Sequence, residues 1–270
     1  MTTSASVREI ILKWYRFLSF SPAYDAAFYA ALDTVYVDAD ANAEHYDQRE
    51  KDGLKNFLHY LYFCEAMECA YEELGIDRAI FLDTLHELVR WTDTWSDLKG
   101  ELYLGEIDWL WHIFTLRIIK LGRLEYNRAA AREDAPAYGI KKGDPVLDIH
   151  IPPDGPLSYE ACLASLAMAR KFYAKYYPEF EYKCFACHSW LLDTSIDDIL
   201  KPGGNILRFH ELFDIVALSP SDAILVFTLR WNVTREEIAD IPPSSAFARV
   251  VKEEALSGRT FYVGYGVIPK

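Results

Sequence analysis

Apolar side chains recur every three or four positions through the first 121 residues, a period that predicts amphipathic helices. Segments of this kind cover residues 6–20, 52–74, 77–98 and 105–121. Gly122 follows the last segment, at the point where a helix C-cap is expected. Because no strand pattern of comparable strength occurs in this half, we predict an all-helical N-terminal domain over residues 1–121.

After Gly122 the pattern changes to short apolar runs that alternate with a helical stripe. Residues 145–152 form an apolar run between turn residues, which predicts a strand. Ser158 has the side chain favoured at an N-cap, and the apolar stripe of the helix that follows runs through residues 162–173. Residues 180–192 are aromatic and compatible with a strand. Two strands joined by one helix predict a parallel, right-handed β-α-β unit.

The last third of the chain predicts further mixed structure. We expect a helix at residues 206–213, a strand at 223–231, a helix at 244–256 and a last strand at 260–268. Gly264 and Gly266 in that last strand indicate a bulge or a close backbone approach. The predicted fold class is therefore α+β, with a second domain over residues 122–270 that holds a mixed sheet around the β-α-β unit.

Composition and charge narrow the class of function. The chain has 270 residues, of which 51% are hydrophobic, so it can bury a substantial core. Its net charge of −13 argues against binding nucleic acid or an anionic membrane surface. No apolar run is long enough to span a bilayer, and the charged N-terminal segment does not resemble a secretion signal. Five cysteines, an odd number, indicate reduced thiols and a cytoplasmic protein.

A Cys-x-x-Cys-His run at residues 184–188 could attach a c-type haem or form a redox pair. On a strand, however, successive side chains point to opposite faces, so Cys184 and Cys187 would diverge. They could then neither bond one porphyrin edge nor pair with each other. We expect no haem here, and interpret both cysteines as small buried hydrophobes.

Two histidines lie at the predicted carboxyl ends of the paired parallel strands, His150 on the first and His188 on the second. Ligands bind outside this edge of open parallel sheets. Asp148 shares a face with His150, so Asp148, His150 and His188 could form a two-histidine, one-carboxylate metal site. The alternatives are structural histidines, or a pocket in which a histidine transfers a proton. We expect Glu125 to be a solvated edge carboxylate.

Three stretches resemble one protein family. "LDIHIPPDGPLSYEACLASLAMARKFY", "FACHSWLLD" and "NILRFHELF" are similar to segments of GNAT-like acyltransferases, in which a helical N-terminal domain precedes a divergent GNAT domain. The likeness covers residues 122–270, and the segments 150–152 and 188–190 are its most specific parts. The usual phosphate loop of such domains, Gln/Arg-x-x-Gly-x-Gly/Ala, is replaced by "PPDGPLSYE".

The resemblance implies an acyl-CoA substrate that enters where the two parallel strands splay apart. Pantetheine would lie along Ile151, and the pyrophosphate would meet the helix that begins at Ser158 and Tyr159; Trp190 completes the expected cofactor-binding set. An amine would attack the thioester directly, with His150 or His188 as base. Ser189 would donate a hydrogen bond to the acyl oxygen or the leaving sulfur.

Two other classes of function stay open at this point. The first is a binding module that keeps the cleft but does not turn over substrate, as loss of the phosphate loop would allow. The second is the metalloenzyme that uses Asp148, His150 and His188. For the acyltransferase we expect acetyl-CoA or another acyl-CoA as donor, a small-molecule acyl acceptor, no metal, and a possible homodimer; the acidic composition mildly favours a cationic acceptor.

Overall fold

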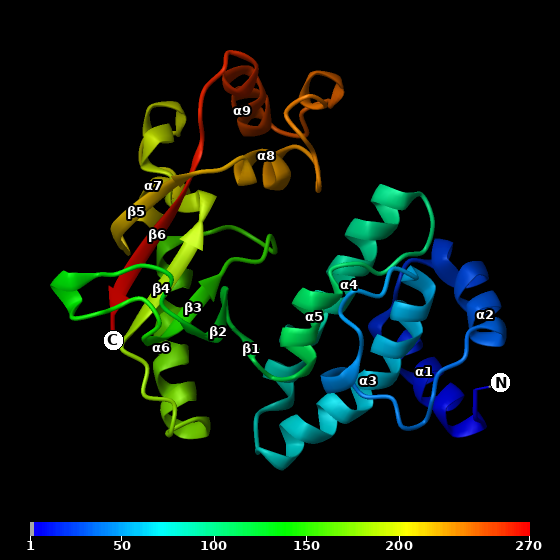
Figure 1. Ribbon diagram of the computed structural model, residues 1–270. Coiled ribbons are helices and arrows are strands. Elements are labelled where there is room, and N and C mark those ends of the chain that lie inside the picture. Colours follow the sequence, from blue (N-terminus) through cyan, green and yellow to red (C-terminus); the bar gives the residue numbers. More distant parts are fainter. Residues whose placement is uncertain (1–2) are drawn as a thin grey trace. The chain divides into compact units, whose positions relative to one another are not determined.

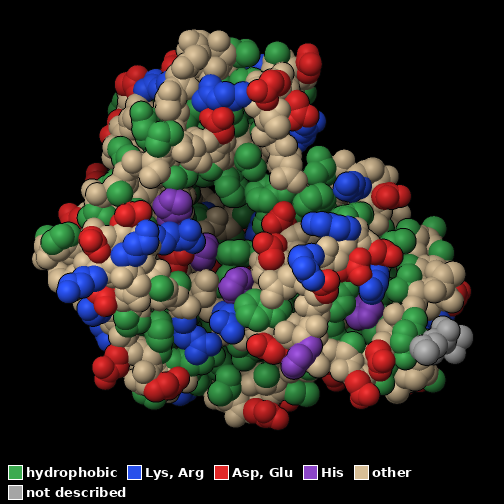
Figure 2. Space-filling view, viewed as in Figure 1, with side chains coloured by type: hydrophobic (Ala, Val, Ile, Leu, Met, Phe, Trp, Pro, Cys, Tyr) green, Lys and Arg blue, Asp and Glu red, His purple; other side chains and the backbone are tan. Residues whose placement is uncertain are grey.

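A computed structural model describes residues 3–270 (Figure 1), and the chain divides into two compact units. One unit ends at Lys120 and the other comprises Leu121–Lys270. Along residues 3–270, no helix combines the length and the apolarity needed to cross a membrane. On the face shown in Figure 2, Lys and Arg side chains are interspersed with Asp and Glu side chains.

The N-terminal unit is helical. Its α-helices are α1 (Ala5–Leu18), α2 (Asp25–Thr34), α3 (Gly53–Glu73), α4 (Arg78–Lys99) and α5 (Ile107–Phe114). The periodic pattern predicted α1, α3 and α4 to within a few residues, whereas α2 was missed. The predicted helix over residues 105–121 is too long. It stops at Phe114 because Leu116 adopts a left-handed backbone (φ 55°), and Ile118–Leu121 forms strand β1 instead.

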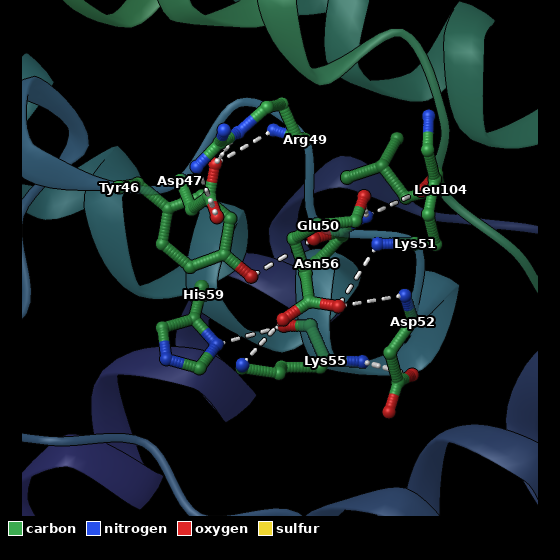
Figure 3. Close-up of polar contacts among 10 residues, drawn as sticks. All are labelled: Tyr46, Asp47, Arg49, Glu50, Lys51, Asp52, Lys55, Asn56, His59 and Leu104. Carbon is green, nitrogen blue, oxygen red and sulfur yellow. Dashed lines mark hydrogen bonds and ion pairs between the residues drawn. The ribbon is translucent and has the colours of Figure 1, made fainter.

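A polar network fixes the start of α3 (Figure 3). The Asp52 side chain caps the helix by accepting from the Lys55 amide at 3.0 Å. Glu50 accepts from the amides of Lys51 and Asp52 and from the Lys55 ammonium. Asn56, which is buried, donates to the carbonyls of Glu50 and Leu104. These bonds satisfy backbone groups that a helix terminus would otherwise leave without partners.

The C-terminal unit is built on a mixed sheet. Among the described residues this sheet has six strands in the order β1-β2-β3-β4-β6-β5. After β1 come β2 (Leu124–Ala130), β3 (Pro145–His150), β4 (Cys184–Ser189), β5 (Asp214–Pro220) and β6 (Tyr262–Pro269). β3 and β4 are parallel, and the pairs β2–β3, β4–β6 and β5–β6 are antiparallel. The predicted β-α-β unit is thus present, with α6 (Tyr159–Tyr176) as its crossover helix.

Three shorter helices complete this unit: α7 (Asn205–His210), α8 (Ala223–Thr228) and α9 (Ala246–Leu256). The prediction of a strand at residues 223–231 is wrong, because this apolar run forms α8. Ile224 and Leu225 are fully buried in a hydrophobic core that also contains Val251 and Phe261. We call it the second core, because it is separate from the core under residues 131–144. A run of four or five apolar residues fits a buried helix as well as a strand. The strand in this region is β5, which lies earlier in the chain.

The two faces of the sheet are covered differently. On one face α6 packs through hydrogen bonds: the Tyr173 hydroxyl donates to the Tyr126 carbonyl at 3.0 Å, and the Leu124 amide donates to the Ser165 hydroxyl at 3.1 Å. On the other face, the segment 131–144 covers one end of the sheet, where Ala131, Ala135 and Ile140 pack on Val146, Cys184, Ala186, Tyr265 and Val267. The polar side chains described below share this second face.

The glycines of β6 confirm the predicted close approach. A Cβ at Gly264 would overlap the Leu192 carbonyl oxygen, and one at Gly266 would lie 2.9 Å from Leu192 Cδ1. The segment that follows β4 therefore packs directly on the backbone of β6.

Ser165 should be a stabilising link between α6 and the sheet. Its hydroxyl donates to the Leu121 carbonyl at 2.5 Å, accepts from the Leu124 amide, and lies 2.9 Å from the Tyr126 hydroxyl, all in a buried setting. Ser165→Ala leaves these groups without a partner, so we expect it to lower the free energy of unfolding by about 1–3 kcal/mol. Urea denaturation measures this. The exposed Ser219→Ala is the control and should change stability by less than about 0.5 kcal/mol; an equal effect of both would contradict the assignment.

Candidate active site

The parallel pair β3–β4 stops pairing before either strand ends. Its register joins Leu147 with Phe185 and Asp148 with Ala186. β3 nevertheless continues to His150 and β4 to Ser189. Beyond Asp148 the two strands therefore run on without a ladder between them, at the carboxyl edge where parallel sheets bind ligands.

Four polar side chains share the face of the sheet opposite α6. In the antiparallel register Glu125 on β2 pairs with His150, and His188 on β4 pairs with Tyr265 on β6. Paired residues point to the same side, and so do residues two apart on one strand. Glu125, Asp148, His150 and His188 consequently lie on one face, as the alternation predicted for Asp148 with His150.

Asp148 is buried, and two basic side chains lie near it. It is 4% exposed, and its Oδ2 atom lies 3.6 Å from His150 Nε2 and 3.8 Å from Arg132 Nη2. Its Oδ1 atom is buried without a hydrogen-bond partner within the described residues. Burial raises the pKa of Asp148 to about 6, and the positive charge of Arg132 opposes that rise. A carboxyl in this state changes its charge close to neutral pH.

His150 is half-buried, with its side chain 25% exposed. Its Nε2 atom faces Asp148, so the ring's Nδ1 is the nitrogen that is not directed at the carboxylate. An imidazole with one nitrogen beside a carboxylate is oriented for proton transfer through the other.

His188 lies further from the pair. Its side chain is exposed, and its ring centroid is 6.5 Å from that of Tyr265. Desolvation lowers its pKa, and the positive charge of Arg132 lowers it further. His188 is therefore favoured in its neutral form at the mouth of the same face.

Ser189 and Cys187 lie on the opposite side of β4 from the histidines. The Ser189 hydroxyl accepts from the Leu191 amide at 3.2 Å and so caps the short turn of helix that follows β4. Cys187 is fully buried, which raises the pKa of its thiol well above the usual value. Cys184, on the other face, has its thiol pKa raised by burial to about 11. Neither cysteine has the thiolate character of a nucleophile.

The segment that replaces the phosphate loop is held by Arg123. Its guanidinium donates to three backbone carbonyls, those of Pro152 at 2.8 Å, Gly155 at 3.3 Å and Pro156 at 3.1 Å. It also lies 3.7 Å from the carboxylate of Asp154. The Arg123 guanidinium thus fixes the turn that leads from β3 into α6.

The start of α6 carries the predicted N-cap. The Ser158 hydroxyl accepts from the Ala161 amide at 3.2 Å. Arg208 on α7 lies over the Tyr159 ring, 4.7 Å from its centroid, and pairs with Glu160 at 2.9 Å. Arg208 therefore offsets one of the two acids of this segment, as Arg123 offsets the other.

Ile151 and Trp190, the remaining predicted cofactor contacts, have different settings. Ile151 is half-buried directly after β3. Trp190 stacks on Phe247 of α9, with ring centroids 6.2 Å apart, and packs against the second core. The contacts of Trp190 are those of a packing residue.

The predicted metal alternative lacks its ligand cluster. Among residues 3–270, no group of three His, Cys, Asp or Glu side chains could hold a metal ion. Asp148 and His150 are close to each other, but His188 does not complete a coordination set with them.

Sequence reasoning misjudged one residue of the site and missed two. Glu125, expected to be solvated, is 1% exposed, because β2 is an inner strand that pairs with β3. Arg132 and Tyr265 were not considered. Alternation along residues 260–268 would have put Tyr265 on a face, but only the strand register shows that this face is the one with His188.

Comparison with known proteins adds two family matches. Residues 118–268 match the GNAT-like C-terminal domain, and residues 4–116 match the N-acyltransferase N-terminal domain. No curated protein matches the sequence.

Solved acyltransferase structures share the fold. One, in complex with decanoyl-CoA and teicoplanin, is 20% identical with a TM-score of 0.77, and the match covers 97% of this chain and 88% of the other. A second, in complex with decanoyl-CoA, is 24% identical with a TM-score of 0.71 over 98% and 85%. A mutant acyltransferase in complex with octanoyl-CoA is 19% identical with a TM-score of 0.76 over 100% and 89%.

The burial of Asp148 predicts a specific pH dependence of stability. Below about pH 4 Asp148 is protonated in both the folded and the unfolded chain, so it does not lower the free energy of unfolding there. As pH rises through about 6, the unfolded chain ionises more readily and stability falls. Asp148→Asn removes this loss, so its stability relative to wild type should rise by about 1–2 kcal/mol between about pH 5 and 7.5.

Urea denaturation of both proteins at the two pH values measures this difference, which is independent of any constant cost of the buried amide. Asp144→Asn is the control. Lys183 lowers the pKa of Asp144 below its ordinary value, so that carboxyl is ionised throughout the interval and its removal should add no pH dependence. A flat difference for Asp148→Asn would show that its carboxyl is not desolvated.

Proposed function

The chain belongs to the GNAT-like acyltransferase family, and from this premise we propose that it is an acyl-CoA-dependent N-acyltransferase that transfers an acyl group directly to an amine. The observation that carries the proposal is the opened end of the β3–β4 pair with the Asp148–His150 pair beside it. A gap between two parallel strands admits an extended pantetheine arm, and Ile151 continues the strand along which it would lie.

His150 is the proposed base. The amine nitrogen attacks the thioester carbon while His150 Nδ1 takes a proton from it, and the resulting imidazolium is stabilised by the Asp148 carboxylate. The tetrahedral intermediate then collapses, the carbon–sulfur bond breaks, and the leaving CoA thiolate takes the proton held by the His150 imidazolium, which returns His150 to its neutral form. Backbone N–H groups at the strand opening would stabilise the oxyanion. Ser189 lies on the opposite face of β4 from His188, so its O–H, whose oxygen accepts from Leu191, would donate to the leaving sulfur or the acyl oxygen only where the thioester passes between the two strands.

His188 has a secondary role in this scheme. Its neutral form is favoured and its side chain is exposed, so it can accept a proton that leaves the site through water. Asp148 lies 3.6 Å from His150, so we expect loss of His150 to lower the rate more than loss of His188.

The donor's pyrophosphate would meet the N-terminus of α6, at Ser158 and Tyr159. The segment "PPDGPLSYE" carries two acids that would repel phosphate, Asp154 and Glu160. Both lie beside a guanidinium, Asp154 beside Arg123 and Glu160 beside Arg208. Because Glu160 is largely exposed, it can turn into solvent and leave Arg208 to a phosphate group.

The ligands of the solved relatives suggest which acyl chain and which acceptor to propose for this chain. Since solved relatives bind decanoyl-CoA and octanoyl-CoA, we propose a medium-chain acyl-CoA ahead of acetyl-CoA. One relative is in complex with teicoplanin, so a glycopeptide amine is the first acceptor to test.

A cytoplasmic location is supported by five unpaired thiols. A homodimer through the outer edge of β5, where Val216 and Leu218 are exposed, is the corresponding proposal for assembly.

His150→Gln should remove the base without removing the donor site. We expect the rate of acyl transfer at saturating octanoyl-CoA to fall by about 10²–10⁴-fold, since general-base catalysis contributes that much. His188→Gln should reduce it by less than about tenfold. Single-turnover release of CoA thiol, with a glycopeptide as acceptor, measures both. Equal activity of His150→Gln and wild type would refute His150 as the base.

Arg208→Gln should weaken donor binding and spare the chemical step. A charge-assisted hydrogen bond to phosphate contributes roughly 1.5–3 kcal/mol, so we expect the Kd of CoA to rise about 10- to 100-fold with kcat at saturating donor within threefold. Calorimetric titration with CoA measures the affinity. Arg170→Gln, which removes a bond to the Pro269 carbonyl on the same unit, is the control. If neither CoA nor octanoyl-CoA binds the wild type, the acyl-CoA proposal fails and a binding module on this fold takes its place.

A further inference from the structure

We propose that Arg132 is a positioning residue of this site, which keeps Asp148 ionised so that Asp148 can orient and stabilise a protonated His150. The inference rests on the proposed function for its catalytic meaning. Its electrostatic content is independent of that function, because it concerns one carboxyl group in the resting protein.

The backbone of Arg132 is fixed by the neck of the 131–144 segment. The Ala131 amide donates to the Asp144 carbonyl at 2.8 Å, and the Gly143 amide donates to the Ala131 carbonyl at 2.9 Å. The Arg132 amide donates to the Tyr265 hydroxyl at 3.3 Å. These bonds anchor Arg132 to the face of the sheet that carries Asp148, although its side chain is 56% exposed.

The guanidinium of Arg132 is placed to act on Asp148 through its charge and not through a hydrogen bond. At 3.8 Å from Asp148 Oδ2, Arg132 Nη2 is beyond direct hydrogen-bond distance, so the attraction is mainly between charges. His150 Nε2, at 3.6 Å from the same oxygen, also interacts with Asp148 through charge, so neither group occupies the carboxylate with a hydrogen bond. A direct salt bridge would satisfy the carboxylate and reduce its interaction with the imidazolium.

The surroundings of Asp148 make this positive charge necessary. Near Asp148 lie His150 on its own strand, Tyr265 on β6, and Arg132 from the covering segment. Glu125 on β2 lies beside His150, and Glu133 acts on His188. Glu125 and Glu133 are acids, and Tyr265 is neutral because burial raises its pKa to about 12. Within this set Arg132 is the permanent cation, so its loss leaves a desolvated carboxyl that binds a proton more readily.

A protonated Asp148 would stop supporting the base. A neutral carboxyl cannot stabilise the imidazolium that forms when His150 takes the amine's proton, so the rate should depend on Asp148 being ionised. The charge of Arg132 keeps the Asp148 carboxyl ionised down to a lower pH. At high pH Asp148 is ionised with or without Arg132, and the effect disappears.

The test uses Arg132→Gln, Arg132→Lys and the control Arg128→Gln in the full chain. Arg128 is in β2, four residues before Arg132, but its pairing with Leu147 puts it on the opposite face of the sheet. There its guanidinium is 3.9 Å from the centroid of the Tyr177 ring. The first arm follows the Asp148 side-chain carboxyl by ¹³C NMR titration without substrate. The second arm measures kcat/KM for acyl transfer from about pH 5.5 to 9.

Arg132→Gln should move the Asp148 titration about 0.5–1 pH unit upward, a shift reduced from the usual range by the exposure of Arg132. The acid limb of kcat/KM should move with it, so that the rate falls about three- to tenfold at acid pH and stays within twofold of wild type at about pH 8.5. Arg132→Lys should restore most of both effects, and Arg128→Gln should cause neither.

Three outcomes would overturn the inference. An unchanged Asp148 titration in Arg132→Gln would show that Arg132 does not hold the carboxyl ionised. A shifted titration with an unshifted pH–rate profile would show that catalysis does not use that ionisation. A rate loss that is equal at all pH values and is not restored by lysine would indicate a structural role instead. A wild type without acyl transfer would overturn the proposed function, whereas the titration arm would still decide the role of Arg132.

Discussion

The site depends on the burial of one carboxylate on an inner strand. Asp148 lies on β3, between β2 and β4, and its Oδ1 atom is buried with no hydrogen-bond partner among the described residues. Such a group destabilises the folded chain at neutral pH, because desolvation opposes its ionisation. A desolvated carboxyl beside a histidine is the kind of pair that the proposed acyl transfer requires.

The architecture provides both the burial and the opening that the pair needs. α6 and its hydrogen bonds through Ser165 occupy the other face of the sheet. On the Asp148 face, the 131–144 segment covers one end, while His150 and His188 remain half-buried and exposed toward the other. Pairing between β3 and β4 stops at Asp148, so the carboxylate lies where the ladder ends and the accessible edge begins. The end of the β3–β4 ladder and a desolvated charge thus lie within three residues of one strand.

Much of this could be read from the sequence, because local signals determined it. Residues 145–150 and 184–189 are apolar runs next to turns, Ser158 is a favoured cap, and alternation put Asp148 and His150 on one face. Predictions failed where local signals were ambiguous. Residues 223–228 form a short helix that buries Ile224 and Leu225 in the second core, and Ile118–Leu121 leaves the helical stripe after the left-handed Leu116. The burial of Glu125 depends on strand order, and the approach of Arg132 to Asp148 depends on register; neither property is encoded in a window of neighbouring residues.

The positive charges near the site explain how an acidic chain can handle anionic groups. A net charge of −13 implies little about one pocket when individual arginines are placed against specific acids. Arg123 binds three carbonyls and Asp154, Arg208 pairs with Glu160, and Arg132 faces Asp148. Arg123 is nearly buried and fixes a turn, whereas Arg208 and Arg132 are substantially exposed and can respond to a ligand. Under the proposed function the same arrangement serves two places: Arg208 on α7 would face the donor's phosphate, as Arg132 faces the buried Asp148.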